Sequence, residues 1–142
     1  MKVLDLNILL YAINKGSDAH TKAKRWLEHA FNDDEPVALP WVVILGFLRI
    51  STHPNVFPSP LTPEVAMEIV DGWLTCPNAQ ILHPGQEHWC VLKRLLNETG
   101  TAGNLTTDSH LAALAIENGA ELQSTDADFG RYASLSWTNP IR

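Results

Sequence analysis

The stretch that decides the fold lies near the N-terminus and reads Lys2-Val3-Leu4-Asp5-Leu6-Asn7-Ile8-Leu9-Leu10. The apolar residues before Asp5 predict a short buried strand, and residues 7–13 predict a helix that follows directly. A carboxylate at the end of a buried strand loses its hydration, which is costly for an unpaired charge. The placement of Asp5 makes physical sense if a cation lies beside it.

The rest of the chain alternates short apolar strands with helices. We expect strands at residues 37–39, 79–82 and 122–125, with a further strand at 135–137. We expect helices from the N-cap Ser17 to Phe31, at 41–51 with Pro40 in the first turn, from the N-cap Thr62 to Thr75, at 86–98, and at 108–118 with Thr107 as cap and Gly119 as the terminating residue. This alternation predicts an α/β domain with a mainly parallel sheet of four to five strands, covered by helices on both faces.

Three carboxylates lie at the ends of these predicted elements. Asp5 and Asp126 follow strands, and Asp108 begins an apolar helix. Ligands bind outside the carboxyl ends of the strands in sheets of this class. A right-handed crossover brings the start of the helix that carries Asp108 to the same edge. The sequence therefore predicts one site that these three residues share, with Asp128 close by.

Oxygen ligands of this kind suit Mg²⁺ or Mn²⁺, which take one or two carboxylates and complete their shells with water and phosphate. Two such ions stabilise the attacking and leaving oxygens of a phosphodiester displacement. Asn7 is expected to orient Asp5 or a bound water, and Thr125 to hydrogen-bond a ligating carboxylate.

Each acid also has a simpler explanation. Asp5 or Asn7 suits the N-cap of the first helix, Asp108 gains from the helix dipole, and residues 126–128 suit a turn. An aspartate nucleophile of phosphatase type is a further alternative, although its motif requires a second aspartate where this chain has Asn7. A zinc site is another, and its best ligand set is Cys76, His83, His88 and Cys90, whose spacing matches no usual zinc motif.

Composition sets further bounds. The chain has 142 residues, which we expect to form one domain over residues 1–142, with a formal net charge of −6. General nucleic-acid-binding proteins usually carry a basic surface, and a net negative charge argues against that class. Bound divalent cations would offset the negative charge locally. No apolar stretch is long enough to span a bilayer and the N-terminus does not read as a signal peptide, so we expect a cytoplasmic protein without membrane contact whose Cys76 and Cys90 are reduced.

Four segments together resemble the PIN-domain ribonuclease toxins of the VapC type. They are residues 3–10, the helix Trp41-Val42-Val43-Ile44-Leu45-Gly46-Phe47-Leu48-Arg49, the segment Asp108-Ser109-His110-Leu111-Ala112-Ala113-Leu114-Ala115, and Thr125-Asp126-Ala127-Asp128-Phe129. The likeness covers essentially the whole chain. It implies a PIN-like three-layer α/β/α sandwich.

The resemblance also implies the activity. The protein would be a Mg²⁺- or Mn²⁺-dependent endoribonuclease that cleaves structured cellular RNA, tRNA or rRNA, by metal-activated water. Asp5, Asp108 and Asp126 would be the catalytic metal ligands, with Asp128 as a further ligand. The partners would be a cognate antitoxin and a second copy of the chain in a homodimer, with operator DNA bound only through the antitoxin.

One position departs from the family pattern. The family commonly has a glutamate just before Phe47-Leu48-Arg49, where this chain has Gly46. One carboxylate of the usual four is therefore absent, which leaves an alternative open: a PIN-fold binding protein with weakened catalysis that retains antitoxin or RNA binding. Arg49, one turn further along, is expected to contact phosphate, to pair with an acid of the site, or to form a surface salt bridge.

Overall fold

The computed structural model describes all residues from 1 to 142. The strands are β1 (Lys2–Leu4), β2 (Val37–Pro40), β3 (Ala79–Leu82), β4 (Glu121–Gln123) and β5 (Ser136–Thr138). The α-helices are α1 (Leu6–Ile13), α2 (His20–Phe31), α3 (Trp41–Ser51), α4 (Pro63–Leu74), α5 (His88–Thr99) and α6 (Thr106–Glu117), and the 3₁₀ helices are η1 (Gly103–Leu105) and η2 (Ala127–Arg131).

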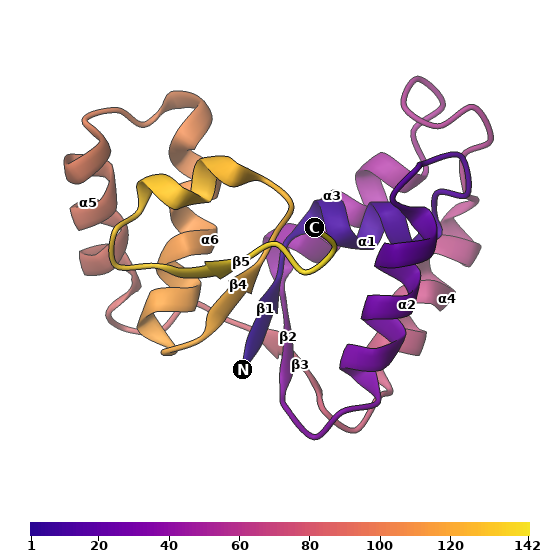
Figure 1. The fold of residues 1–142 in the computed structure, drawn as a ribbon. Coiled ribbons are helices and arrows are strands. Elements are labelled where there is room, and N and C mark those ends of the chain that lie inside the picture. Colours follow the sequence, from indigo (N-terminus) through magenta and orange to yellow (C-terminus); the bar gives the residue numbers. More distant parts are fainter.

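The five strands form one sheet in the order β3-β2-β1-β4-β5, and every neighbouring pair is parallel (Figure 1). The apolar residues of β1, β2 and β4 are buried, as expected for strands covered on both faces. The predicted mainly parallel sheet is confirmed with five strands, all of them parallel.

The helices divide between the two faces of the sheet. In Figure 1, α1 to α4 lie to one side and α5 and α6 to the other. The strand order explains this division, because the chain moves from β1 to β3 in one direction and then returns across the sheet to β4. Neighbouring strands β1 and β4 thus send their connections to opposite faces, which makes their carboxyl ends the place where ligands bind in sheets of this class.

Several predicted helix starts are confirmed and two are wrong. Thr62 caps α4 by accepting the Val65 N–H at 3.2 Å, and Gly119 has a φ of +58° after α6. Ser17 does not cap α2, which begins at His20, because its hydroxyl forms a local turn with the Ala19 N–H instead. Thr107 does not cap α6 either, since η1 runs directly into that helix and places the residue inside its first turn.

Further boundaries shift by one or two residues. Pro40, expected in the first turn of α3, ends β2 and stands at the N-cap position of that helix. β4 ends at Gln123, although the sequence predicted a strand to residue 125. None of the helices has both the length and the apolar character needed to cross a membrane.

Gly46 allows α1 to pack closely on α3. The residue is buried, and a Cβ built on it would lie 2.7 Å from Cδ2 of Leu6, the first residue of α1. Any larger residue at position 46 would overlap with the Leu6 side chain unless that side chain moved. Because Leu6 follows Asp5 directly, this contact also supports the end of β1, where the candidate site begins.

A double-mutant cycle tests this packing. Alanine is favoured over glycine inside a helix by about 0.5–1 kcal/mol. We expect Gly46→Ala to give this gain in a Leu6→Ala background, whereas in the wild type the overlap with Leu6 offsets it. The free energy of unfolding from urea titration measures both effects, and equal effects in the two backgrounds would show that the contact is not limiting.

Candidate active site

Asp5 is held by both neighbouring elements at the end of β1. Its Oδ1 accepts the N–H of Leu6 at 2.7 Å, so the residue is the N-cap of α1. Its Oδ2 accepts the hydroxyl of Ser124 at 2.6 Å, and its own N–H donates to the carbonyl of Gln123 at 3.0 Å. Both oxygens therefore have a fixed orientation, and each retains lone-pair capacity for another partner.

Ser124 joins two of the predicted acids. The residue is fully buried directly after β4, and its Oγ accepts the N–H of Asp126 at 3.0 Å while it donates to Asp5. Sequence reasoning assigned the hydrogen bond to Thr125, and this prediction is wrong: Thr125 forms no side-chain hydrogen bond, and its neighbour makes the contact. The connection fixes the distance between the ends of β1 and β4.

Asp108 completes a group of three acids from separate segments of the chain. It lies half-buried in the first turn of α6. Burial raises its pKa above the ordinary 3.8, and the charges of Asp126 and Asp5 raise it further, while Arg131 opposes them. Asp5, Asp108 and Asp126 therefore lie within electrostatic range of one another, and their shared role as metal ligands stays a prediction.

The position of Asp5 opposes ionisation of its carboxyl. Burial is the main cause that raises the pKa of its carboxyl, and the charge of Asp126 adds to this effect. The hydrogen bonds from Ser124 and Leu6 lower the pKa but do not cancel the rise. The ionised form is therefore destabilised in the folded chain without a cation.

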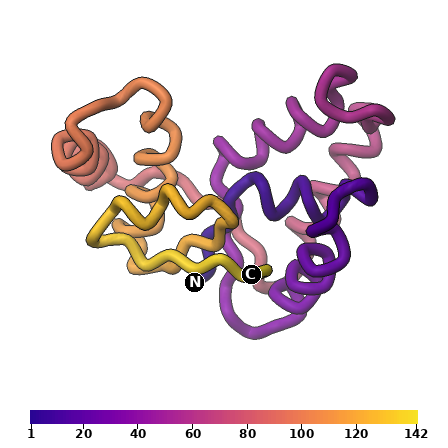
Figure 2. Tube along the Cα trace, turned by 45° about the horizontal axis from the view of Figure 1, so that its top comes forward, coloured from indigo at the N-terminus to yellow at the C-terminus, as the bar shows by residue number.

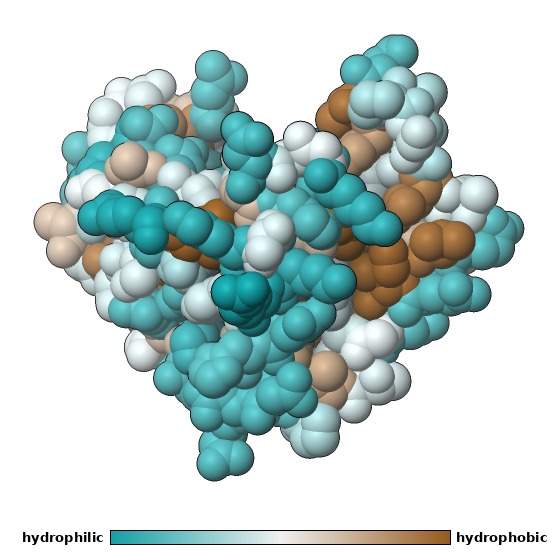
Figure 3. All heavy atoms as spheres, turned by 45° about the vertical axis from the view of Figure 1, so that its right-hand side comes forward, coloured by the Kyte–Doolittle hydropathy of each residue, from teal (hydrophilic) through white to brown (hydrophobic).

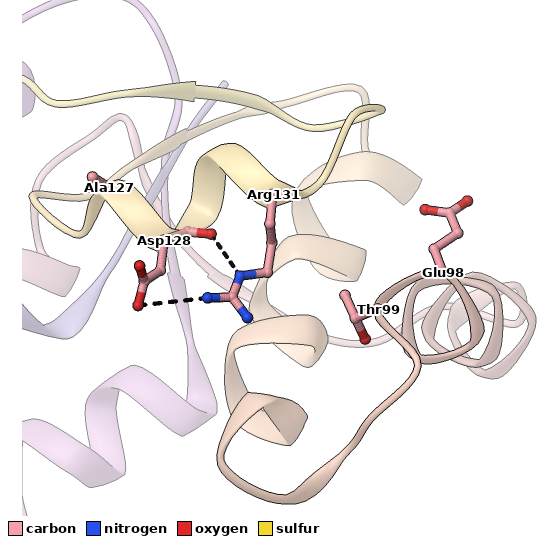
Figure 4. A pocket seen from close by; sticks show the side chains of 5 residues that line it. All are labelled: Glu98, Thr99, Ala127, Asp128 and Arg131. Atoms are coloured by element: carbon pink, nitrogen blue, oxygen red, sulfur yellow. Dashed lines mark hydrogen bonds and ion pairs between the residues drawn. The ribbon is translucent and has the colours of Figure 1, made fainter.

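Asp128 lies differently from the other three acids. It is exposed at an open pocket of about 460 Å³, which Figure 4 shows with Glu98, Thr99 and Arg131. Its carboxylate pairs with the Arg131 guanidinium at 3.6 Å, and the Arg131 Nε–H donates to its backbone carbonyl at 3.0 Å. Its predicted metal role stays a prediction. Arg131, which sequence reasoning did not place in the site, is the cation that acts on Asp108.

The two remaining predicted residues have contrasting surroundings. Asn7 lies in the first turn of α1, and its Oδ1 is buried without any hydrogen-bond partner. A buried acceptor of this kind is costly unless a donor or a cation reaches it. Arg49 is exposed at the end of α3 and forms no ion pair, so it pairs neither with an acid of the site nor with a surface acid.

The donor set fits a hard divalent cation. It consists of carboxylate oxygens that repel one another, and Asn7, two residues after Asp5, has a buried Oδ1 without a partner. No group of three His, Cys, Asp or Glu side chains lies close enough to surround an ion by itself. An ion bound here would take one or two carboxylates and complete its shell with water, which is the usual coordination of Mg²⁺.

The residues of the zinc alternative lie in separate environments. The Cys76 Sγ contacts the Gly72 carbonyl at 3.5 Å, and His83 lies against the Trp41 ring. His88 instead bonds His110 at 2.8 Å and Glu117 at 3.2 Å, which joins α5 to α6.

A buried hydrogen bond supports the position of Asp108. The hydroxyls of Ser109 and Tyr132 lie 2.8 Å apart, and both residues are buried. Ser109 follows Asp108 in α6, and Tyr132 follows η2, which Asp126 caps. The contact thus fixes the segment of one acid against the segment of another, and no local sequence signal marks it.

The site occupies the edge that the strand order favours. The carboxyl ends of β1 and β4 point toward the top of the molecule in Figure 1, and the surface is hollowed at the top in Figure 3. The arrangement can bind a cation and bring a polyanionic substrate to it.

Comparison with known proteins identifies the class. The family model for the PIN domain matches residues 2–135. The chain belongs to the PIN domain family, and its resemblance to the VapC type is confirmed by full-length relatives.

Ribonuclease VapC37 of Mycobacterium tuberculosis is 42% identical over 140 residues, which cover 99% of this chain and 97% of the relative. Ribonuclease VapC33 of the same organism is 41% identical over 142 residues, which cover 100% and 99%. Solved structures share the fold: FitAcB from Neisseria gonorrhoeae has a TM-score of 0.72 at 16% identity, with 99% and 98% of the two chains covered. VapBC2 from Rickettsia felis, bound to a promoter DNA fragment, has a TM-score of 0.66 at 23% identity, with 96% of each chain covered.

Removal of the Ser124 hydroxyl tests the connection between the strands. Ser124→Ala leaves the Asp126 N–H and one oxygen of Asp5 without their partner, and we expect a loss of about 1–3 kcal/mol in the free energy of unfolding. The pKa of Asp5, measured by carboxyl NMR titration, should rise because this hydrogen bond lowers it. Ser136→Ala, at an exposed position of β5, is the control and should change neither quantity.

The charge of Asp108 should destabilise the metal-free protein. The pKa of Asp108 is higher in the folded chain than the ordinary value of 3.8. The loss of stability that ionised Asp108 causes is therefore absent below pH 3.8, grows above this pH, and is complete once the pH exceeds the folded pKa. In EDTA at pH 7 we expect Asp108→Asn to have a higher Tm than the wild type, with the difference vanishing below pH 3.8. Added Mg²⁺ should raise the Tm of the wild type more than that of Asp108→Asn. An equal rise in both proteins would contradict a role of Asp108 in metal binding.

Proposed function

We propose that this protein is the ribonuclease toxin of a toxin–antitoxin pair and that it hydrolyses phosphodiester bonds of structured RNA, tRNA or rRNA, with Mg²⁺ or Mn²⁺. The observation that carries the proposal is the convergence of Asp5, Asp108 and Asp126 from three segments at the carboxyl edge of the sheet. Full-length relatives at 42% and 41% identity bear the name ribonuclease, which supports the reaction class.

Asp5, Asp108 and Asp126 would hold the ion together, one or two of them directly and the remainder through bound water, with Asp128 as a further ligand. Bound Mg²⁺ or Mn²⁺ supplies two effects, the neutralisation of charge on the phosphate and the acidification of water. The chain supplies the rest of the arrangement: Ser124 and the Leu6 N–H hold both oxygens of Asp5 in place.

Arg131 is positioned to act on the substrate. Its guanidinium lies at the open pocket beside Asp128 and close enough to Asp108 to lower the pKa of that acid. An arginine in this position can donate to a phosphate group of the RNA, because its planar fork matches phosphate oxygens.

The proposal includes protein partners. The structure of VapBC2 from Rickettsia felis contains a DNA fragment from the promoter, which supports a cognate antitoxin, with operator DNA bound through it. Large apolar side chains remain exposed on α3, where Trp41 and Leu45 lie one turn apart, and apolar patches appear in Figure 3 on the side that carries α1 to α4. Such surfaces fit a protein partner, either the antitoxin or a second copy in a homodimer. The cytoplasm, where these RNAs occur, is the proposed place of action.

Gly46 favours a second candidate, a PIN-fold protein with weakened catalysis that retains antitoxin or RNA binding. Gly46 has no side chain, so the carboxylate that the family commonly has at this position is absent. Leu6 occupies the space beside Gly46. Growth arrest on expression, abolished by Asp5→Ala, would exclude this candidate.

The first candidate predicts the behaviour of Asp5→Asn. The amide oxygen can still accept the Leu6 N–H, and the amide NH2 can donate to the Ser124 hydroxyl oxygen, so we expect the fold to be retained. Loss of the negative charge should abolish metal-dependent cleavage, by at least about 100-fold, because removal of one key electrostatic group commonly costs this much. Cleavage of cellular RNA by the antitoxin-free protein, with Mg²⁺, Mn²⁺ or EDTA, measures the effect.

Mapping of RNA 5′ ends after induction identifies the target in the same experiment. New ends should appear with the wild type and not with Asp5→Asn. Cleavage by Asp5→Asn at the rate of the wild type would contradict the assignment of the site. Absence of cleavage by the metal-loaded wild type would refute the ribonuclease proposal as a whole.

A further inference from the structure

A second pocket outside the acidic site combines basic and aromatic side chains. It has a volume of about 430 Å³ and is lined by Lys22, Arg25, Trp26 and His29 of α2 and by Arg142 from the C-terminal segment. Residues of the C-terminal segment and of α2 line this pocket together, and Figure 2 shows the C-terminus near α2. Basic groups from two distant parts of the chain therefore meet at one place.

These charges have no internal function that accounts for them. The five ion pairs of the protein use Lys2, Arg94 and Arg131 among the lysines and arginines, so Lys22, Arg25 and Arg142 are unpaired. All three are exposed. Three of the ten lysines and arginines of an acidic chain thus gather around one pocket without a partner.

The spacing in α2 explains how one helix presents the group. Lys22, Arg25 and His29 are separated by three and four residues and so lie on one face. Trp26 packs partly against the core and also lines the pocket, which leaves part of its ring available to a ligand. Phosphate-binding cations around an aromatic surface are the combination with which proteins bind single-stranded nucleic acid.

The pocket is connected to the carboxyl edge of the sheet. The Thr138 carbonyl accepts the Ser124 N–H at 3.1 Å, and the Trp137 indole donates to the Ser124 carbonyl at 3.0 Å. Arg142 follows four residues after Thr138, so its Cα lies within about 15 Å of that of Thr138. A strand that enters the acidic site would reach the pocket within a few nucleotides.

We infer that this pocket binds the RNA strand next to the cleaved segment, with phosphates on Lys22, Arg25 and Arg142 and a base against Trp26. The inference rests on the proposed ribonuclease function. Its physical reason is that a protein of net charge −6 with three acids at the site repels a polyanion, so binding needs a local basic surface. An acidic protein segment is the other occupant that the charge would admit, but it would not use the aromatic ring.

Salt-dependent binding of RNA tests the pocket separately from catalysis. Asp5→Asn prevents cleavage and serves as the background for each variant, with a fluorescent single-stranded oligouridine as probe. For single strands the slope of log K against log salt changes by about 0.7 for each phosphate contact that is lost. We expect Lys22→Ala and Arg25→Ala each to lower the slope by about this amount and to weaken binding severalfold at low salt.

Lys24→Ala is the matched control. Lys24 lies in the same helix, is exposed and unpaired, and carries the same charge, but it does not line the pocket. Its removal should leave the slope unchanged, and Arg25→Lys should retain the slope of the background. Equal slopes for Lys22→Ala, Arg25→Ala and Lys24→Ala would overturn the inference, even if the wild type cleaves RNA.

A fluorescent decaglutamate measured in parallel distinguishes the other occupant. Binding of this peptide more tightly than the RNA, with loss in Lys22→Ala and Arg25→Ala, would assign the pocket to an acidic protein segment and overturn the inference. The slopes are measured without turnover, so RNA binding that depends on the pocket supports the inference even if the wild-type protein shows no cleavage.

Discussion

The hydrogen bond from Ser124 to Asp5 is the interaction on which the site depends. The bond is 2.6 Å long, its donor Ser124 is fully buried, and the same hydroxyl accepts the N–H of Asp126. Burial is the main cause that raises the pKa of Asp5, and repulsion from the charge of Asp126 adds to it. The serine therefore holds together two strand ends that their charges push apart, and it does so with a neutral group that occupies little space.

The strand order supplies the second part of this arrangement. α1 and α6 lie on opposite faces of the sheet, yet both begin at the carboxyl edge, because α1 follows β1 and α6 leads back to β4. Asp5 caps one of these helices and Asp108 lies in the first turn of the other. The positive ends of two helix dipoles thus partly offset the repulsion among the acids, independently of any bound ion.

The sequence was sufficient for the features that have a local signal. An acid after an apolar run marks the strand ends at Asp5 and Asp126, and an acid before an apolar helical run marks Asp108. The alternation of strands and helices predicted the parallel sheet. The error at Thr125 has a specific cause: β4 ends at Gln123, and because side chains alternate along an extended chain, a shift of one residue exchanges which neighbour faces the site. Contacts between distant segments, such as the bond between Ser109 and Tyr132 and the tail beside α2, leave no local pattern. The pairing of Asp128 with Arg131 depends on the short helix η2, whose turn brings the two side chains together.

Gly46 illustrates how packing and charge are coupled at this edge. The space beside it is taken by Leu6, so the first turn of α1 packs on α3 without an acid between them. A fourth carboxylate near Asp5 and Asp108 would attract a cation more strongly, but it would also raise the pKa of both acids further in the metal-free protein. With glycine at this position, the chain carries less repulsion in the absence of metal, and under the proposed function its affinity for a cation would depend more on the three acids that remain. The precise orientation of Asp5 by Ser124 and Leu6 therefore has a larger effect here than it would have in a site with four acids.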